Sequence, residues 1–204
     1  MTITEQKAFL RSYTGQAQAP ADFAQRWQET AAALHPAVSC APVAFGNPCG
    51  VYERLTVTFD GRSVTARVIR PAADGVHPLL LMYHDLNRGV RGWHHITRFL
   101  ALGFGVVAPE AEPFREDWKV QPAQAAFRQL GYIDSKNFAP MIRCPVLFGT
   151  GLDDVICPPQ TQCAVYNNLH CAKKRYLFPG YGHEEIPEFD DMLLDFFTSK
   201  EAVL

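Results

Sequence analysis

Residues 79–108 read LLLMYHDLNRGVRGWHHITRFLALGFGVVA, and this stretch is the strongest indication of the fold class. The continuous apolar run at 79–83 predicts a central strand that is covered on both faces. The segment 93–102 predicts a helix that ends at Gly103, and residues 105–108 predict a second short, buried strand. A strand, a helix and a strand in this order are typical of a βαβ unit in a parallel sheet.

Further elements are predicted on both sides of this unit. Apolar and polar residues alternate at 51–59 and at 63–69, and Asp60-Gly61 lies between them, which predicts a β-hairpin that we place at the edge of the sheet. Residues 37–50, which are rich in proline and glycine, predict an irregular connection. The remaining expected elements are strands at 145–149 and 175–178 and helices at 21–34, 122–130, 159–169 and 189–197.

The fold class that follows is α/β, with a mostly parallel sheet, helices on both faces and an amino-terminal β-hairpin. The chain has 204 residues, of which 48% are hydrophobic and 20% are charged, and this predicts a single domain over residues 1–204. Within that domain, residues 1–50 are expected to form an amino-terminal helix and an irregular arm.

Charge and composition limit the partners and the cellular location that we expect. The formal net charge is -2, and lysine and arginine are scattered rather than clustered, so we expect neither nucleic acid nor a membrane as a partner. The first residues lack the pattern of a secretion signal, and we expect a cytoplasmic protein. The six cysteines are therefore expected to be reduced thiols, with a bond between Cys40 and Cys49 under oxidising conditions as the alternative.

Two short segments in the second half of the chain contain an acid and a base in the setting of a hydrolase. They are Gly151-Leu-Asp-Asp154 and Gly182-His-Glu184. A serine hydrolase on an α/β sheet also needs Gly-x-Ser-x-Gly, because only a strained turn between small residues exposes the serine hydroxyl. No serine of this chain lies between glycines after an apolar strand; the serines are Ser12, Ser39, Ser63, Ser135 and Ser199.

These segments belong to a longer series. Pro20-Ala-Asp-Phe23 with Trp27 comes first, and Tyr83-His-Asp-Leu-Asn87 follows the strand at 79–83. Matching segments continue in order at 132–134, 137–139, 144–147, 151–154, 157–159, 164–167 and 182–187. The series resembles the acetyl-xylan esterase and cephalosporin C deacetylase family, carbohydrate esterase family seven, whose members have the α/β-hydrolase fold.

By this resemblance Asp154 matches the acid of the catalytic triad and His183 matches its base. The resemblance also implies a pocket at the ends of the strands. We assign to that pocket Tyr83, His84, Leu86, Cys157 and Glu184.

The departures from the family pattern concern the nucleophile. Residues 111–135 stand where the family places its nucleophile strand, elbow and following helices, but these 25 residues predict only one short helix. A βαβ unit needs about 30 residues or more. Leu86 stands where the family has the tyrosine that helps to bind the oxyanion, and Glu110 stands where it has an aspartate followed by Arg-Gly-Gln-Gly. We therefore expect a reduced α/β-hydrolase sheet in which the strands at 79–83 and 146–149 become neighbours.

Two other chemistries are compatible with some of the residues. Cys157 follows Asp154 on the same loop and could supply a thiol nucleophile to His183, although its setting favours a packing role. His84, His94 and His95 could join His183 in a metal site, but they lack the usual ligand spacing and carboxylate support. We expect no metal and no cofactor.

Three function classes remain open. The first is a serine-type ester hydrolase that deacetylates small acetylated sugars or related esters. The second is a non-catalytic relative that binds such a ligand or assembles with other chains. The third is a cofactor-free acid–base enzyme (a lyase, cyclase or isomerase) in which His183 moves a proton. The second class is favoured. The lost unit should expose apolar surface near Phe114, Trp118 and Phe127, which predicts a homo-oligomer or a hetero-oligomer with a full-length paralogue.

Overall fold

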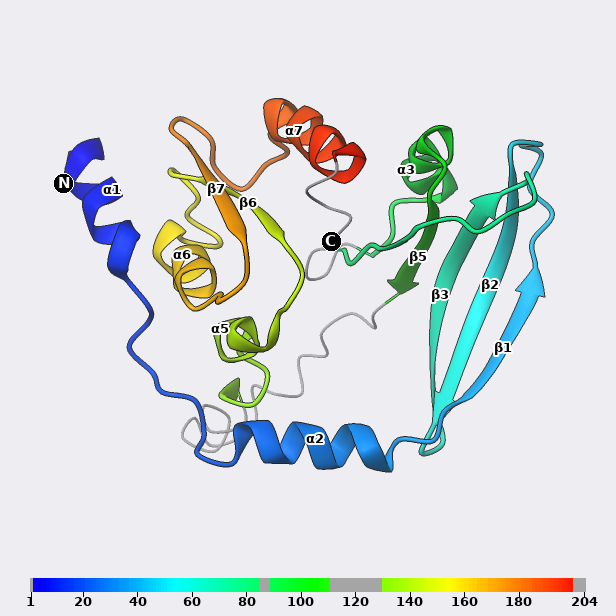
Figure 1. Ribbon diagram of the computed structural model, residues 1–204, viewed down its shortest axis with the longest axis horizontal. Helices are drawn as coiled ribbons and strands as arrows, with labels where there is room; N and C mark the ends of the chain where they lie inside the picture. The colour runs from blue at the N-terminus through cyan, green and yellow to red at the C-terminus, as the bar shows by residue number, and fades with distance from the viewer. Residues whose placement is uncertain (1, 85–88, 111–129, 200–204) are drawn as a thin grey trace. The chain divides into compact units, whose positions relative to one another are not determined.

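The computed structural model describes residues 2–84, 89–110 and 130–199 (Figure 1). The chain divides into two compact units, which we call the first unit (residues 1–26 and 121–204) and the second unit (residues 27–120). The single domain over residues 1–204 stays a prediction. The expected apolar surface near Phe114, Trp118 and Phe127 lies outside the described residues, as does the expected helix at 122–130 apart from Leu130.

The second unit contains a five-stranded sheet in the order β1-β2-β3-β5-β4. Neighbouring strands are antiparallel except β4 and β5, which are parallel, so this sheet is mixed rather than mostly parallel. The strands are β1 (Ala37–Pro42), β2 (Gly50–Phe59), β3 (Arg62–Pro71), β4 (Leu79–Leu81) and β5 (Gly105–Glu110).

The predicted hairpin is confirmed as β2 and β3. Asp60 and Gly61 both have positive φ, 48° and 71°, and Phe59 pairs with Arg62 across them. Positive φ at both central positions is the turn geometry that matches the twist of a hairpin. The hairpin is not an edge, however, because β1 pairs with β2 on its other side. The prediction of an irregular connection at 37–50 was wrong for residues 37–42, which form β1. All six side chains of this strand are exposed, so its sequence lacks the alternating pattern that would have indicated a strand.

Among the described strands, the strand at 79–83 ends its sheet and does not lie in its centre. β4 is the last described strand of the order, and Leu79 and Leu81 are 60% and 61% exposed. An apolar run indicates a strand but does not tell an edge from a centre. In the described residues β4 pairs with β5 and β6 pairs with β7, so the expected pairing of the strands at 79–83 and 146–149 is not among the strand pairs.

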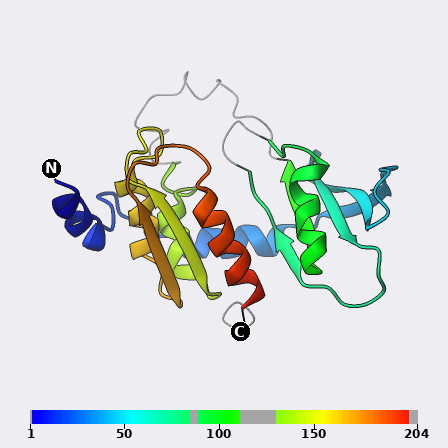
Figure 2. The same ribbon diagram turned by 90° about the horizontal axis from the view of Figure 1, so that it is seen from above.

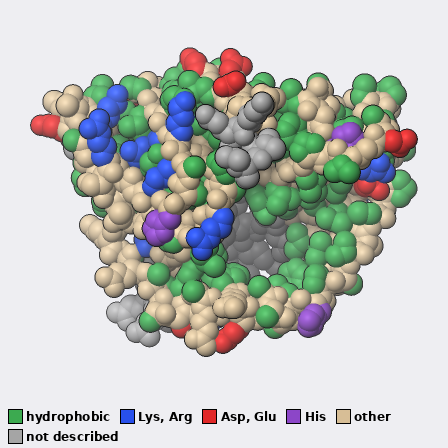
Figure 3. Space-filling view, in the orientation of Figure 1, with side chains coloured by type: hydrophobic (Ala, Val, Ile, Leu, Met, Phe, Trp, Pro, Cys, Tyr) green, Lys and Arg blue, Asp and Glu red, His purple; other side chains and the backbone are tan. Residues whose placement is uncertain are grey.

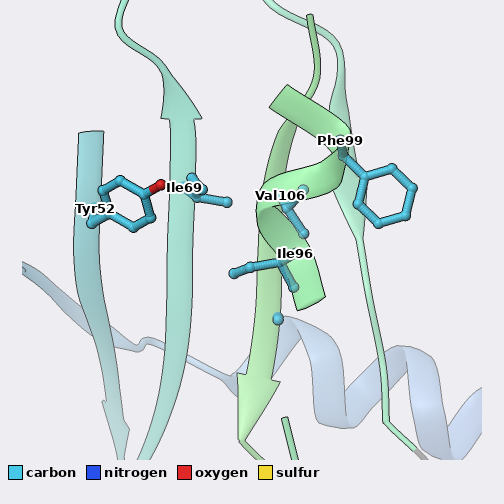
Figure 4. Packing of buried hydrophobic residues seen from close by; sticks show 6 residues of the cluster. Tyr52, Ile69, Ile96, Phe99 and Val106 are labelled. Atoms are coloured by element: carbon cyan, nitrogen blue, oxygen red, sulfur yellow. The ribbon is translucent and has the colours of Figure 1, made fainter. Parts of the chain in front are cut away.

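The core of the second unit lies between its sheet and the segment that connects β4 to β5. This segment forms α3 (Trp93–Thr97) and the 3₁₀ turn η1 (Arg98–Leu102), and Gly103 ends it with a φ of 79°. Figure 4 shows Ile96 and Phe99 from this segment beside Val106 of β5 and near Ile69 and Tyr52 of the hairpin. The predicted strand–helix–strand unit is therefore confirmed.

The first unit is built on the parallel pair β6 (Val146–Gly151) and β7 (Lys173–Phe178). Phe148 contacts Tyr166 of α6 (Pro159–Asn167), whereas a Cβ on Gly149 would meet the ring of Phe189 on α7 (Pro187–Thr198). Successive strand residues point to opposite faces, so α6 and α7 cover the two faces of this pair, as Figure 2 shows. This arrangement confirms the prediction of helices on both faces for the first unit.

Of the remaining helical elements, only the helix at 23–33 was predicted, as part of 21–34; the other three were not. α1 (Ile3–Ser12) begins with a capping box in which the Thr2 hydroxyl accepts from the Glu5 amide and the Glu5 carboxylate accepts from the Thr2 amide. The pattern Thr-x-x-Glu was the signal available in the sequence. The remaining elements are α2 (Phe23–Ala33), α5 (Ser135–Phe138) and the 3₁₀ turn η3 (Ala139–Met141). Every helix in the described part of the chain is too short or too polar to cross a bilayer.

Candidate functional site

The candidate site of the first unit lies where β6 and β7 end. The chain leaves β6 at Gly151 and reaches Asp154 three residues later, while His183 lies in the segment between β7 and α7. The Leu152 amide donates to the Phe178 carbonyl at 2.9 Å, and the Asp153 amide donates to the Tyr181 carbonyl at 2.9 Å. The carboxyl ends of adjacent parallel strands meet at one edge, where α/β sheets place their ligands.

Asp154 and His183 form the hydrogen-bonded pair that the sequence predicted. His183 Nδ1 lies 3.0 Å from Asp154 Oδ2, and Asp154 is only 6% exposed. An ionised carboxylate can only accept, so the imidazole donates through Nδ1–H. The backbone amides of Ile156 and Cys157 donate to Oδ1 at 2.9 and 2.8 Å, and Gln162 Nε2 donates to Oδ2 at 3.1 Å. Asp154 therefore holds the imidazole in one tautomer and one orientation, as the acid of a triad does.

These contacts keep the acid ionised. Burial alone raises the pKa of Asp154, but the hydrogen bonds from the Cys157 amide, from His183 and from the Ile156 amide outweigh it and hold the pKa below its usual value. The carboxylate is thus charged at neutral pH despite its burial.

Gly151 allows the acid segment and the histidine segment to come this close. A Cβ at position 151 would lie 2.6 Å from the Tyr181 carbonyl oxygen and 2.7 Å from the Gly182 carbonyl oxygen. Both are backbone atoms that cannot swing aside as a side chain does. Any larger residue at this position would move the segment that carries His183.

The segment around His183 is held by further polar contacts. The Gly180 amide donates to Asp153 Oδ2 at 2.7 Å, and Gly180 has a φ of 83°. The Tyr181 hydroxyl donates to Glu188 Oε2 at 2.8 Å, which raises the pKa of Tyr181. Glu188 lies in the first turn of α7, and Figure 3 shows acidic side chains near this helix. Negative charge there suits the positive end of the helix dipole.

Two of the predicted pocket residues belong to this site. The Cys157 amide binds Asp154, while its exposed thiol lies 3.7 Å from Thr161 Oγ1. Glu184 Oε1 accepts from the Gly182 amide at 3.0 Å, so this carboxylate braces the turn that presents His183. Neither contact tests a role in binding a ligand, which stays a prediction.

The other predicted pocket residues are not part of the first unit as described. Tyr83 is 74% exposed and His84 is partly buried, and both belong to the second unit. Leu86 lies outside the described residues. A role for these three residues in one pocket with His183 stays a prediction.

Glu110, noted as a departure from the family pattern, forms a cluster in the second unit. Its carboxylate accepts from Arg67 Nε at 2.8 Å, from Arg54 Nη1 at 2.8 Å and from Thr65 Oγ1 at 2.9 Å. Partial burial raises the pKa of Glu110, but the bonds from Arg67 and Thr65 and the charges of Arg54 and Arg67 outweigh it and lower the pKa overall. Glu110 thus joins β2, β3 and β5 at the end of the sheet.

Residues 2–84, 89–110 and 130–199 contain no cluster of three or more His, Cys, Asp or Glu that could hold a metal ion. His84, His94, His95 and His183 are all among these residues, and none of them is part of such a cluster. The six cysteines, which are also all described, form no disulfide.

Sequence reasoning missed three residues that shape the site. Gln162 binds Asp154 from α6, and it also donates to the Cys157 carbonyl at 2.6 Å. Asp153 ties the acid segment to Gly180. For Gln162 no local pattern was available, because a side chain on the following helix has no fixed spacing to the acid; Asp153 and Gly151 lie in the motif itself and could have been singled out.

Fold and site together define the class as an α/β protein of the hydrolase type. One solved structure with the same fold is acetyl xylan esterase 1 from Thermoanaerobacterium sp. JW/SL YS485, with a TM-score of 0.83, 21% identity, and coverage of 96% of this chain and 98% of that chain. Another is an acetyl xylan esterase from Paenibacillus sp. R4, with a TM-score of 0.79, 16% identity, and coverage of 96% and 98%.

The chain belongs to the acetyl xylan esterase (AXE1) family, whose model matches residues 4–112 and 111–200. These two structures confirm the prediction of an α/β-hydrolase fold. The family assignment made from the sequence segments is confirmed as well.

Proposed function

We propose that this chain is a member of the acetyl xylan esterase family without a serine nucleophile, which binds a small ester or an acetylated sugar without cleaving it efficiently. The observation that carries the proposal is the contrast between two parts of the triad. His183 Nδ1 lies 3.0 Å from Asp154 Oδ2, and a hydrogen bond from the Gly180 amide to Asp153 Oδ2 joins the two segments that carry this pair. The sequence contains no Gly-x-Ser-x-Gly with which they could act.

The way in which the family model matches the chain supports this proposal. The match consists of two stretches that meet at residues 111–112. Residue 111 is where the shortened segment of residues 111–135 begins, which is the region expected to hold the nucleophile unit. An internal loss of that unit agrees with both observations. The acetylated sugar is suggested by the acetyl xylan esterases that share the fold.

The expected loss of activity is large. In subtilisin, removal of the catalytic serine lowers kcat by about 10⁶-fold, and the remainder comes from binding and from the oxyanion site. An oriented imidazole can still activate water as a general base. The chain is therefore expected to hydrolyse esters far more slowly than a working esterase does.

The test is hydrolysis of p-nitrophenyl acetate by the wild type, His183→Ala and His170→Ala, purified in parallel. His170 is an exposed histidine of the same unit and serves as the matched control. We expect all three proteins to give the same slow rate, and calorimetry with xylose tetraacetate to show saturable binding by the wild type. Turnover near that of a working esterase, lost only in His183→Ala, would overturn the proposal.

A second candidate function is cofactor-free proton transfer, and the low pKa of Asp154 favours it. An ionised acid at 3.0 Å keeps the imidazole of His183 oriented as a base without any covalent step. The test is exchange of the acetyl methyl protons of bound xylose tetraacetate, which lie α to the ester carbonyls, for deuterium, followed by NMR. Exchange that His183→Ala abolishes would favour this function over simple binding, and exchange equal to that in buffer would rule it out.

A further inference from the structure

We infer that Gln6, on α1, is a positioning residue for the Asp154–His183 pair. Gln6 Nε2 donates to the Leu152 carbonyl oxygen at 3.1 Å across 146 positions of the chain. Leu152 lies two residues before Asp154. The inference rests on the proposed function only in taking this pair as the working part of the site.

The Gln6 bond completes the support of the acid segment. On the side of β7, the Leu152 amide donates to the Phe178 carbonyl and the Asp153 amide donates to the Tyr181 carbonyl, both at 2.9 Å. On the other side, the Leu152 carbonyl oxygen accepts the hydrogen bond from Gln6 of α1. The peptide groups that lead to Asp154 are thus held from two elements that are far apart in the sequence.

α1 is itself fixed firmly enough to act as a support. Leu10 is buried in one cluster with Leu152 and Cys163, so α1 packs directly against the residue that Gln6 binds. At the end of α1, Asn167 Nδ2 donates to the carbonyls of Leu10 and Tyr13 at 3.0 and 2.7 Å. These bonds satisfy carbonyls that the helix terminus leaves without an intrahelical partner.

The beginning of α1 is fixed as well. The capping box of Thr2 and Glu5 orders the turn that immediately precedes Gln6, with Thr2 N to Glu5 Oε2 at 2.7 Å. A glutamine in an ordered helical turn loses less entropy on binding than one on a loose segment. Gln6 therefore presents its amide to Leu152 from a preorganised position.

The experiment measures how fast the Nδ1–H proton of His183 exchanges with water, by NMR of the full chain without ligand. This proton lies in the bond to Asp154 Oδ2 and exchanges when the acid segment moves away. Gln6→Met keeps the length of the side chain but cannot donate, and we expect exchange to become roughly three- to tenfold faster. Gln6→Lys can donate to the same carbonyl and should restore slow exchange.

The control variant is Asn168→Ala. Asn168 Nδ2 donates to the Thr14 carbonyl at 3.0 Å and to the Ala164 carbonyl of α6 at 2.8 Å, so this change weakens the docking of the segment after α1 without touching Leu152. It should lower the melting temperature and leave the exchange of the His183 proton unchanged. Equal exchange in Gln6→Met and the wild type would overturn the inference, as would faster exchange in Asn168→Ala to the same degree. Because no ester is present, the result is independent of whether the chain binds or cleaves one.

Discussion

Replacing Gly151 by alanine tests the close approach that brings Asp154 and His183 together. The added Cβ would lie 2.6 Å from the Tyr181 carbonyl oxygen and 2.7 Å from the Gly182 carbonyl oxygen. Ordinary contacts between such atoms exceed 3 Å, so the backbone before His183 has to move by several tenths of an ångström. Overpacking of this kind costs about 1 to 3 kcal/mol, and the rigid backbone on both sides places Gly151→Ala at the upper end.

Two other glycines provide matched controls. A Cβ at Gly149 would meet the Phe189 ring at 2.9 to 3.1 Å, and a ring can shift more easily than backbone, so Gly149→Ala should cost about 1 kcal/mol. Gly46 has nothing within 4 Å of such a Cβ, and Gly46→Ala should leave the stability unchanged or raise it slightly.

The assay is urea unfolding followed by circular dichroism, together with the NMR signal of the His183 Nδ1–H proton. We expect the free energy of unfolding to fall in the order Gly46→Ala, Gly149→Ala, Gly151→Ala, and the His183 signal to broaden or shift most in the last variant. Wild-type stability with an unchanged His183 signal in Gly151→Ala would refute the steric argument.

Asp154→Asn should lower the free energy of unfolding by about 2 kcal/mol or more at neutral pH, because the new amide N–H faces donors. The pKa of Asp154 is lowered in the folded state, so its contribution is complete above the usual carboxyl pKa of about 4 and is lost as the pH falls through the folded pKa. Urea unfolding at pH 7 and at pH 3 should therefore show a difference between the two proteins that shrinks in acid, and a constant difference would contradict this. Glu110→Gln should cost about 1 kcal/mol at neutral pH, because the bonds from Arg54 and Arg67 lose their charge–charge part; high salt should reduce the difference, and an equal loss in salt would argue against it.

Much of the fold followed from local patterns. The hairpin was predictable because Asp60-Gly61 favours the positive φ values that its turn requires. The helix before Gly103 was predictable from its apolar spacing and from the glycine that ends it. β1 was not predictable, because exposed side chains on an edge strand need no pattern and its bonds are made by the backbone alone. The position of β4 at the end of the described strands was not predictable, because an apolar run suits a strand at the edge or in the centre of a sheet.

The residues of the candidate site also differ in whether the sequence could predict them. Asp154 and His183 could be named from short motifs, since the residues that present an acid and a base lie next to them in the chain. Their supports could not, because Gln162 and Gln6 reach the acid segment from separate helices. The local sequence around an amide side chain on a helix does not indicate which carbonyl or carboxylate that side chain will bind.

The sequence by itself determined the α/β class, the turn of the hairpin, the two short motifs that contain Asp154 and His183, and the absence of a Gly-x-Ser-x-Gly segment. Each of these depends on residues that are adjacent or a few positions apart. Only the tertiary structure decided that β4 is the last of the described strands in its sheet, that Gly151 lies against the backbone at Tyr181 and Gly182, and that Gln6 binds Leu152. These contacts join residues that are far apart in the chain, and their geometry exists only once the strands and helices have packed.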